Sequence, residues 1–342
     1  MPMDTSVSLN LAKQRLDYYT CPIGIRCRFD LIAKFQHMSI STTSVSKYYG
    51  KQKALNDVSF SISQGEVVGF LGPNGAGKST MMKIITCYIP PTSGNVSVCG
   101  FDVNEQSIEA RRCIGYLPEH NPLYLDMYVR EYLSFVGKIY GVKNLRNRVE
   151  EMIEMVGLGV EAHKKIEALS KGFRQRVGIA QSMIHDPRVL ILDEPTSGLD
   201  PNQLAEIREL ILRIGKEKTV LLSTHIMQEV EAICDRAIII SNGIIVADSP
   251  TSELGNLTRG NSYQLIVEFS GIISGDFIRK INGVDSATEI GQNSWMITSN
   301  SNVDIRKDIS DLAAAQGHAI LTLTRKEQKL EDVFKELTTT QN

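Results

Sequence analysis

Residues 69–80 read Gly-Phe-Leu-Gly-Pro-Asn-Gly-Ala-Gly-Lys-Ser-Thr, and this stretch decides the fold. Residues 72–79 match the pattern G-x-x-x-x-G-K-[ST] in full. They follow the apolar run of residues 66–71 and precede a run with helical character at residues 78–89. A strand, a glycine-rich loop and a helix in this order predict an α/β domain with a phosphate-binding loop.

The residue types in this loop explain why it should bind a nucleotide. Glycines let successive backbone N–H groups point at phosphate oxygens, and the helix N-terminus adds positive charge. Lys78 would neutralise the β- and γ-phosphates, and the Ser79 hydroxyl could ligate Mg²⁺. The alternative is a glycine turn without function, but a chance match would also need the flanking strand and helix. The predicted contact residues are Gly72, Pro73, Asn74, Gly75, Ala76, Gly77, Lys78, Ser79 and Thr80.

Two adjacent acids end a second apolar run, VLILDEP at residues 189–195. Buried acids are costly at the end of a strand unless a cation or a reacting water needs them. We therefore expect Asp193 to hold the Mg²⁺ shell and Glu194 to face the γ-phosphate. The competing interpretation of Glu194 is a helix-capping or solvated acid.

Two further segments contain candidate functional residues. In LSKGFRQRV, residues 169–177, Ser170 and Gly172 stand at the start of a predicted helix, where hydroxyl and amide groups could bind another anion. His225 follows the apolar run TVLLS on a predicted loop. A lone histidine is more often structural, but its place on a loop after this run makes His225 a functional candidate.

Composition limits the classes of function. Lys and Arg number 37 against 39 Asp and Glu, so the net charge of -2 gives a polyanion no attraction, and we expect no nucleic-acid partner. No apolar run is long enough to cross a bilayer. The six cysteines lack CxxC spacing, which argues against a zinc site and a disulfide framework and favours a reducing cytoplasm.

The chain of 342 residues suits one large domain and one small one. Residues 38–250 alternate strand-like and helical runs, with a helical insertion at about 127–183 and a hairpin at Asn242-Gly243. Residues 251–342 show the order β-α-β-β-α-β with a trailing helix. This order predicts a small ferredoxin-like α+β domain, with a regulatory or dimer-supporting role.

Residues 1–37 fit neither domain and carry no secretory signal pattern. We expect them to be a non-native extension upstream of a biological start at Met38. The alternative is a short disordered or docking tail.

Taken together, the motifs resemble those of the ABC transporter ATPase family over Ser39–Pro250. Tyr49 resembles the aromatic residue that stacks on adenine, although the adjacent Tyr48 could take that place. Residues 115–124, GYLPEHNPLY, are similar to the interlobe segment that contacts membrane subunits. The SGLD run at residues 197–200, which ends in Asp200, resembles the loop that crosses between subunits, and His225 resembles the switch histidine.

The resemblance is closer to ATP-binding subunits of drug- and polymer-export systems, above all to the gliding-motility-associated ABC ATPase. It rests on residues 117–124, 169–181 and 330–338. It implies the fold of an ABC-type phosphate-loop NTPase, with a mixed sheet core, an antiparallel β part and the helical insertion.

The resemblance also implies a mechanism. Two copies would close around two Mg-ATP and drive separate membrane permease subunits from the inner face of the cell membrane. Glu194 would polarise the attacking water, while His225 and Lys78 stabilise the γ-phosphate. Ser170 and Gly172 of the opposite copy would complete each site. The alternatives are a soluble ABC-type ATPase acting on a ribosome or DNA complex, and a nucleotide-binding regulator without turnover.

The sequence departs from the family pattern at two places. Glu119 stands where much of the family has Gln, and its carboxylate could still bind Mg²⁺ or water. Lys171 and Phe173 replace Gly and Gln in the signature sequence, while Ser170 and Gly172 remain.

Overall fold

A six-stranded sheet forms the centre of the larger domain in the computed structural model, which describes residues 38–256, 263–299, 304–326 and 334. Its strand order is β10-β9-β3-β8-β7-β6, with β10 antiparallel to β9 at one edge and the other neighbours parallel. The strands are β3 (Val67–Leu71), β6 (Ile114–Leu117), β7 (Val189–Asp193), β8 (Thr219–Thr224), β9 (Arg236–Ser241) and β10 (Ile244–Pro250).

Both faces of this sheet are covered, as its continuous apolar runs require. In β7, Val189 and Ile191 join the apolar cluster on one face, while Leu190 and Leu192 join the cluster on the other. Side chains alternate between faces along a strand, so one run of five residues serves two cores. The strand predictions at residues 66–71, 189–194 and 219–224 are thereby confirmed to within one residue.

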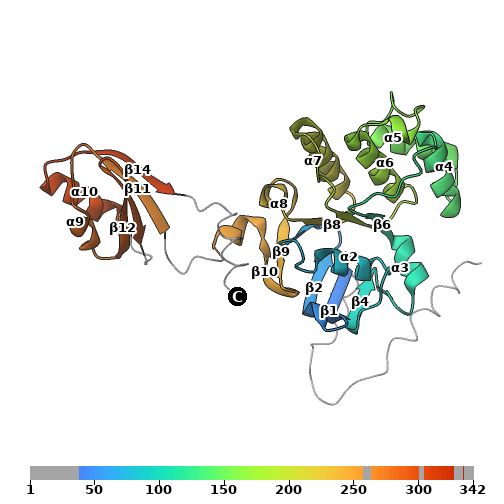
Figure 1. Cartoon of the computed structure of the whole chain (residues 1–342), viewed down its shortest axis with the longest axis horizontal. Helices are drawn as coiled ribbons and strands as arrows, with labels where there is room; N and C mark the ends of the chain where they lie inside the picture. The colour runs from blue at the N-terminus through green and yellow to red at the C-terminus, as the bar shows by residue number, and fades with distance from the viewer. Residues whose placement is uncertain (1–37, 257–262, 300–303, 327–333, 335–342) are drawn as a thin grey trace, which may run out of the picture. The chain divides into compact units, whose positions relative to one another are not determined.

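The N-terminal part of the described chain forms a second sheet, which is antiparallel. Its order is β2-β1-β4-β5, formed by β1 (Met38–Tyr49), β2 (Gln52–Ser63), β4 (Ser93–Val98) and β5 (Phe101–Asp102). Helix α2 (Lys78–Ile85) contacts strands of both sheets (Figure 1). Its Met81, Met82, Ile84 and Ile85 are fully buried, so packing on two sides fixes the helix that starts at Lys78.

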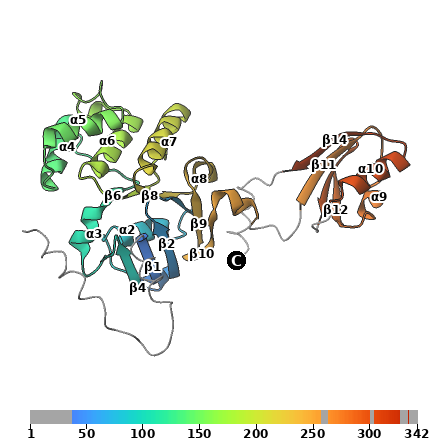
Figure 2. The ribbon, with the colours of Figure 1, turned by 180° about the vertical axis from the view of Figure 1, so that it is seen from behind.

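The predicted helical insertion is confirmed as a group of helices beyond the sheet edge at β6 (Figure 2). It contains α4 (Val129–Ile139), α5 (Leu145–Met155), η1 (Ile166–Ala168) and α6 (Lys171–Met183). Their apolar faces share one cluster with α7 (Pro201–Gly215) and α8 (Met227–Ile233). Helix α3 (Ser107–Cys113) packs instead with the cluster that holds α2.

The predicted hairpin joins β9 to β10. Asn242 and Gly243 have φ angles of 49° and 76°, the positive values that this turn requires.

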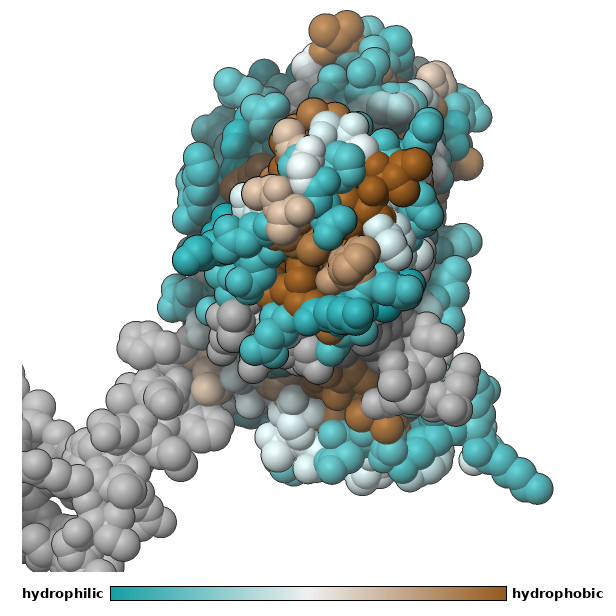
Figure 3. Space-filling view, turned by 90° about the vertical axis from the view of Figure 1, so that its left-hand side faces the viewer, coloured by the Kyte–Doolittle hydropathy of each residue, from teal (hydrophilic) through white to brown (hydrophobic). Residues whose placement is uncertain are grey.

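The smaller domain is built on an antiparallel sheet of order β12-β13-β11-β14. Its elements, after η2 (Thr251–Asn256), are β11 (Tyr263–Phe269), α9 (Gly275–Arg279), β12 (Val284–Gly291), β13 (Ser294–Ser299), α10 (Arg306–Ala315) and β14 (Ile320–Lys326). The predicted β-α-β-β-α-β order is confirmed. The core contains Phe269 and Trp295. Figure 3 shows a face on which brown apolar residues lie among teal polar ones.

Two predictions fall on other parts of the chain. The extension at residues 1–37 and the trailing helix, apart from Phe334, lie outside the described residues. Within the described ranges, no helix is both long and apolar enough to cross a bilayer.

Candidate functional site

The glycine-rich loop after β3 is held by backbone contacts that exclude larger residues. A Cβ at Gly72 would lie 2.4 Å from the Ile240 carbonyl oxygen, and one at Gly77 would lie 2.7 Å from the Ala54 oxygen. Gly77 also has a φ of 110°, which side chains disfavour. The loop therefore needs glycine at both positions to turn from β3 into α2.

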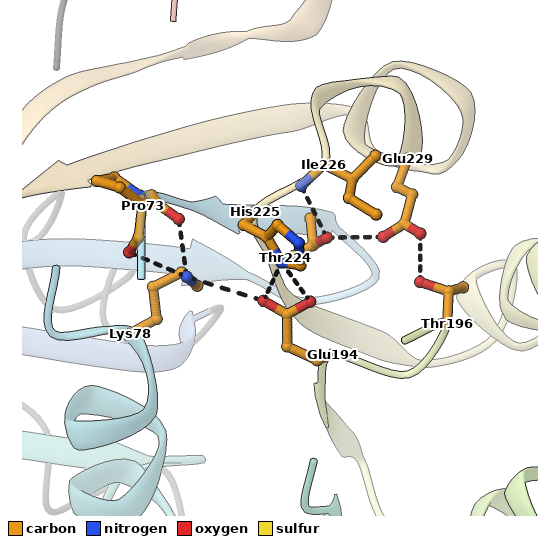
Figure 4. A network of polar contacts seen from close by, with 9 residues as sticks. Pro73, Lys78, Glu194, Thr196, Thr224, His225, Ile226 and Glu229 are labelled. Carbon is orange, nitrogen blue, oxygen red and sulfur yellow. Dashed lines mark hydrogen bonds and ion pairs between the residues drawn. The ribbon is translucent and has the colours of Figure 1, made fainter. Parts of the chain in front are cut away.

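Lys78, the first residue of α2, is 6% exposed. Its ammonium group donates hydrogen bonds to the carbonyl oxygens of Gly72 at 2.7 Å and Pro73 at 3.3 Å. Figure 4 shows this group between the loop and Glu194, whose Oε1 is 3.8 Å from Lys78 Nζ. Burial lowers the pKa of Lys78, and the Glu194 carboxylate opposes that shift.

Glu194 follows β7 in a conformation that is unusual for a residue with a side chain, with φ at 51°. Its amide donates to the Ser223 carbonyl of β8 at 2.9 Å, and the residue is 7% exposed. Burial raises the pKa of Glu194, while the hydrogen bond from His225 lowers it. The buried carboxyl is thus held next to a lysine and a histidine.

His225 lies on the loop after β8, and its ring points at Glu194 (Figure 4). Nδ1 is 2.9 Å from both carboxylate oxygens of Glu194. Because an ionised carboxylate only accepts hydrogen bonds, Nδ1 carries the hydrogen in this contact. The pair therefore has the geometry for a base oriented by a histidine.

These groups line one cavity of about 640 Å³, which is within the usual range for small-molecule sites. Most of the predicted nucleotide contacts meet there. The lining consists of Tyr49, Gln52, Ala54, Asn74, Gly75, Gly77, Lys78, Ser79, Thr80, Glu119, Glu194, Ser197 and His225.

The hairpin between β1 and β2 also contributes to the lining of this cavity. Of the two adjacent tyrosines, Tyr49 lines the cavity, and its ring is 48% exposed. Gln52, which pairs with Tyr49 in the hairpin register, and Ala54 also line it. Gln52 and Ala54 were not predicted from the sequence, although they follow Tyr49 by only three and five positions.

Ser170, Gly172 and Asp200 do not belong to the lining of this cavity. The Ser170 hydroxyl caps α6 by accepting from the Phe173 amide at 3.3 Å. Asp200 caps α7 by accepting from the amides of residues 202 and 203. Within one chain, both side chains therefore act as helix caps.

A second cavity of about 520 Å³ shares Glu119, Glu194 and Ser197 with the first. Lys171 and Arg174 of α6 line its other side. The Lys171 side chain lies against Gly198, where an added Cβ would be 2.3 Å from Lys171 Nζ. The lysine that departs from the signature pattern thus contacts the SGLD loop of its own chain.

The donor set around Asp193 fits Mg²⁺ that is bound together with phosphate. Asp193 Oδ1 is buried without a hydrogen-bond partner among the described residues, and burial raises the pKa of Asp193. The nearby hydroxyls of Ser223 and Ser79 oppose that shift. In the part of the chain that the structure describes, no group of three His, Cys, Asp or Glu could hold a metal alone. Mg²⁺ commonly takes few protein ligands and the rest from substrate phosphates and water.

Comparison with known proteins assigns the family. The pattern of the family described as ABC transporter matches residues 55–197. The chain is 34% identical over 301 residues to the bacitracin transport ATP-binding protein BcrA of Bacillus licheniformis, covering 87% of this chain and 96% of that one. This chain belongs to the ATP-binding subunits of ABC transporters. It is also 34% identical to the linearmycin resistance ATP-binding protein LnrL of Bacillus subtilis, over 87% of this chain and 98% of that protein.

Solved structures of ABC cassettes agree with this assignment. CbiO1 from Clostridium perfringens, part of an ABC transporter complex, aligns with a TM-score of 0.59 at 28% identity over 64% of this chain and 90% of that chain. A dimeric ATP-binding cassette bound to ADP and phosphate aligns with a TM-score of 0.57 at 28% identity, over 62% of this chain and 98% of that chain. The chain is accordingly an ATPase that binds ATP.

One buried acid close to Glu194 and His225 was not predicted from the sequence to be a functional residue. Glu229 on α8 is fully buried, and its carboxyl accepts hydrogen bonds from the hydroxyls of Thr196 and Thr224. An acid within a short helical segment usually faces solvent, so the residue type did not indicate that Glu229 is buried. Its position four residues after His225 was the one available indication.

Proposed function

We propose that this ATPase closes on a second copy of itself around two Mg-ATP and drives separate membrane permease subunits. The observation that carries the proposal is the convergence of Lys78, Glu194 and His225 in one cavity that Ser170 and Gly172 do not line. Each chain then offers one half of a complete site, and a second copy would supply the other half.

In the proposed reaction, Glu194 polarises the attacking water from the end of β7. His225 holds Glu194 through Nδ1, while its exposed ring reaches toward the γ-phosphate and the water. Lys78 exchanges its contacts with the loop carbonyls and Glu194 for phosphate oxygens, and so neutralises charge as it develops.

Mg²⁺ would be held by Ser79 and Asp193, with Glu119 within reach of the same cavity. When bound, the ion would neutralise charge on the β- and γ-phosphates. Tyr49 would stack on the adenine in the same cavity, and Gly72, Pro73 and Ala76 would shape the loop beneath the phosphates. Ser170, Gly172 and Asp200 would contact the nucleotide site of the second copy.

The permease would dock on the helical insertion near the cavity, between Glu119 and Tyr140. This segment exposes several large apolar side chains, a feature of interaction surfaces. They include Tyr124, Tyr128, Phe135, Ile139 and Tyr140, with Ile139 68% exposed. The chain would then work at the cytoplasmic face of the cell membrane.

The transport system would be an exporter or a gliding-motility-associated complex. Two relatives are named for bacitracin transport and linearmycin resistance, which favours export. The gliding-motility alternative rests on the resemblance in residues 117–124, 169–181 and 330–338. The C-terminal domain would regulate the cassette or support the dimer.

The test is Glu194→Gln, which keeps the side chain's shape and removes the base. ATP hydrolysis should fall by at least about 100-fold. The variant should also form an ATP-dependent dimer that light scattering detects. Glu209→Gln, at an exposed acid on α7, is the matched control and should behave like the parent. Turnover near the parent rate in Glu194→Gln would disprove the assigned base.

A further inference from the structure

Glu229 connects the two loops that carry the catalytic pair, and it does so from complete burial. Its carboxyl accepts from the Thr224 hydroxyl at 2.7 Å and, on the other oxygen, from the Thr196 hydroxyl. Thr196 and Thr224 are themselves 3% and 0% exposed. A buried carboxyl is costly to retain, and here both of its oxygens are satisfied by one specific pair of hydroxyls.

The two threonines stand next to the residues that perform the reaction. Thr196 is two positions after Glu194, and Thr224 directly precedes His225. Figure 4 shows the chain of contacts from Thr196 through Glu229 to Thr224, beside the contact between Glu194 and His225. Side chains therefore join the ends of β7 and β8 twice, once through the catalytic pair and once through Glu229.

Thr224 extends this connection to the phosphate loop. Its hydroxyl accepts from the Ile226 amide at 3.1 Å, which fixes the backbone on both sides of His225. Its carbonyl accepts from the Gly72 amide at 3.4 Å. One buried acid thus anchors a residue that contacts both the histidine loop and the start of the phosphate loop.

The geometry of the pair needs such an anchor. Glu194 keeps a φ of 51°, a conformation that persists only where the surroundings hold it. His225 Nδ1 lies at the same 2.9 Å from both carboxylate oxygens, so a small shift of either loop changes both contacts. The main-chain bond from Glu194 to Ser223 fixes the start of one loop but not the position of the histidine ring.

We propose that Glu229 is a positioning residue for ATP hydrolysis: through Thr196 and Thr224 it holds the Glu194 and His225 loops in register. The inference rests on the proposed roles of Glu194 and His225. Glu229, Thr196 and Thr224 do not line the nucleotide cavity, so their loss should change the rate of the chemical step more than the KM for ATP. Removal of an acid with only a structural role would lower stability and would not lower kcat selectively over the KM for ATP.

Thr196→Val and Thr224→Val test the proposal in the full chain, because valine keeps the shape of threonine and lacks the hydroxyl. The kcat of each variant should fall by about tenfold or more, since small misplacements of catalytic groups are costly. The KM for ATP should stay within about threefold of the parent. Thr196→Ser and Thr224→Ser restore a hydroxyl donor and should keep kcat within about twofold of the parent. Glu229→Gln, which retains one acceptor, should lower kcat in the same way and serves if a valine variant does not fold.

The outcomes separate this inference from the proposed function. A parent chain that hydrolyses no ATP would refute the proposed function itself. An active parent with valine variants at the parental kcat would overturn only the role of Glu229. The role would also be overturned if KM rose in step with the fall in kcat, or if the serine variants were as slow as the valine variants. Melting curves recorded beside the kinetics identify any variant that is unfolded at the assay temperature.

Discussion

The phosphate-loop half of the site and the signature half differ in what their polar groups contact. Around Lys78, buried charges meet one another, and Lys78, Glu194 and His225 share one cavity. Around Ser170 and Asp200, the side chains instead cap the helices α6 and α7 of their own chain. In the first half, the predicted catalytic side chains meet within one chain. In the second half, the side chains predicted to bind ATP cap helices instead.

In the proposed dimer, this difference would let a single chain carry the catalytic side chains while a second copy completes the site. At the start of α6, Ser170 and Lys171 are exposed, whereas Gly172 is buried. A helix start whose side chain caps it in one chain can still present hydroxyl and amide groups to an anion bound by another copy. Substitutions in the two halves should therefore differ in effect, with the largest loss of hydrolysis expected at Lys78.

Lys78→Ala removes the cation from the phosphate-loop half. ATP hydrolysis should fall by at least about 100-fold, because one charge that stabilises the transition state is lost. Steady-state phosphate release measures this effect. Lys83→Ala, on the exposed side of the same helix, is the control and should retain the parental rate. Loss of activity in both variants would point to a damaged helix rather than to a role of Lys78.

Tyr49→Ala tests the proposed stacking of adenine on Tyr49 in the same half. Loss of one aromatic stack should raise the KM for ATP by up to about tenfold and leave kcat nearly unchanged. Tyr48→Ala should change neither parameter, because Tyr48 lies outside the lining of the cavity. Tyr49→Phe keeps the ring and should behave like the parent. An effect of Tyr48→Ala that equals that of Tyr49→Ala would contradict this placement.

Asp200→Ala tests the signature half, where the structure gives the side chain a capping role. Loss of the cap on α7 should lower the free energy of unfolding by about 1 kcal/mol, measured by denaturant titration. Asp200→Asn retains a good cap and should restore that stability. If Asp200 also contacts the second copy, Asp200→Asn will still reduce hydrolysis. A stable Asp200→Asn with the parental rate would leave Asp200 with the capping role alone.

Much of the fold could be predicted from the sequence because strong local patterns coincide with buried elements. The phosphate loop, the strand ending at Asp193 and the Asn242-Gly243 hairpin each combine an apolar run with a residue type that the backbone requires. The C-terminal β-α-β-β-α-β order was equally clear from its alternating runs.

The rest of the site depends on contacts that spacing does not encode. Glu229 follows His225 by four residues, but its hydroxyl partners come from the ends of β7 and β8, one of them 33 residues away in sequence. The contact of Lys171 with Gly198 likewise arises from how α6 packs beside the SGLD loop. Such contacts form only when the fold brings distant segments together, so they can be identified only in the structure.

The most direct test of a shared site is cross-linking between copies. One chain carries Ser170→Cys and the other carries Asn74→Cys in the exposed part of the phosphate loop, both with Glu194→Gln to hold ATP. A short bis-maleimide cross-linker, which forms a thioether with each cysteine, is added with and without Mg-ATP, and mass spectrometry identifies the joined peptides. We predict a link between residue 170 of one chain and residue 74 of the other that forms only with nucleotide. Absence of this link in a nucleotide-bound dimer would contradict the shared site.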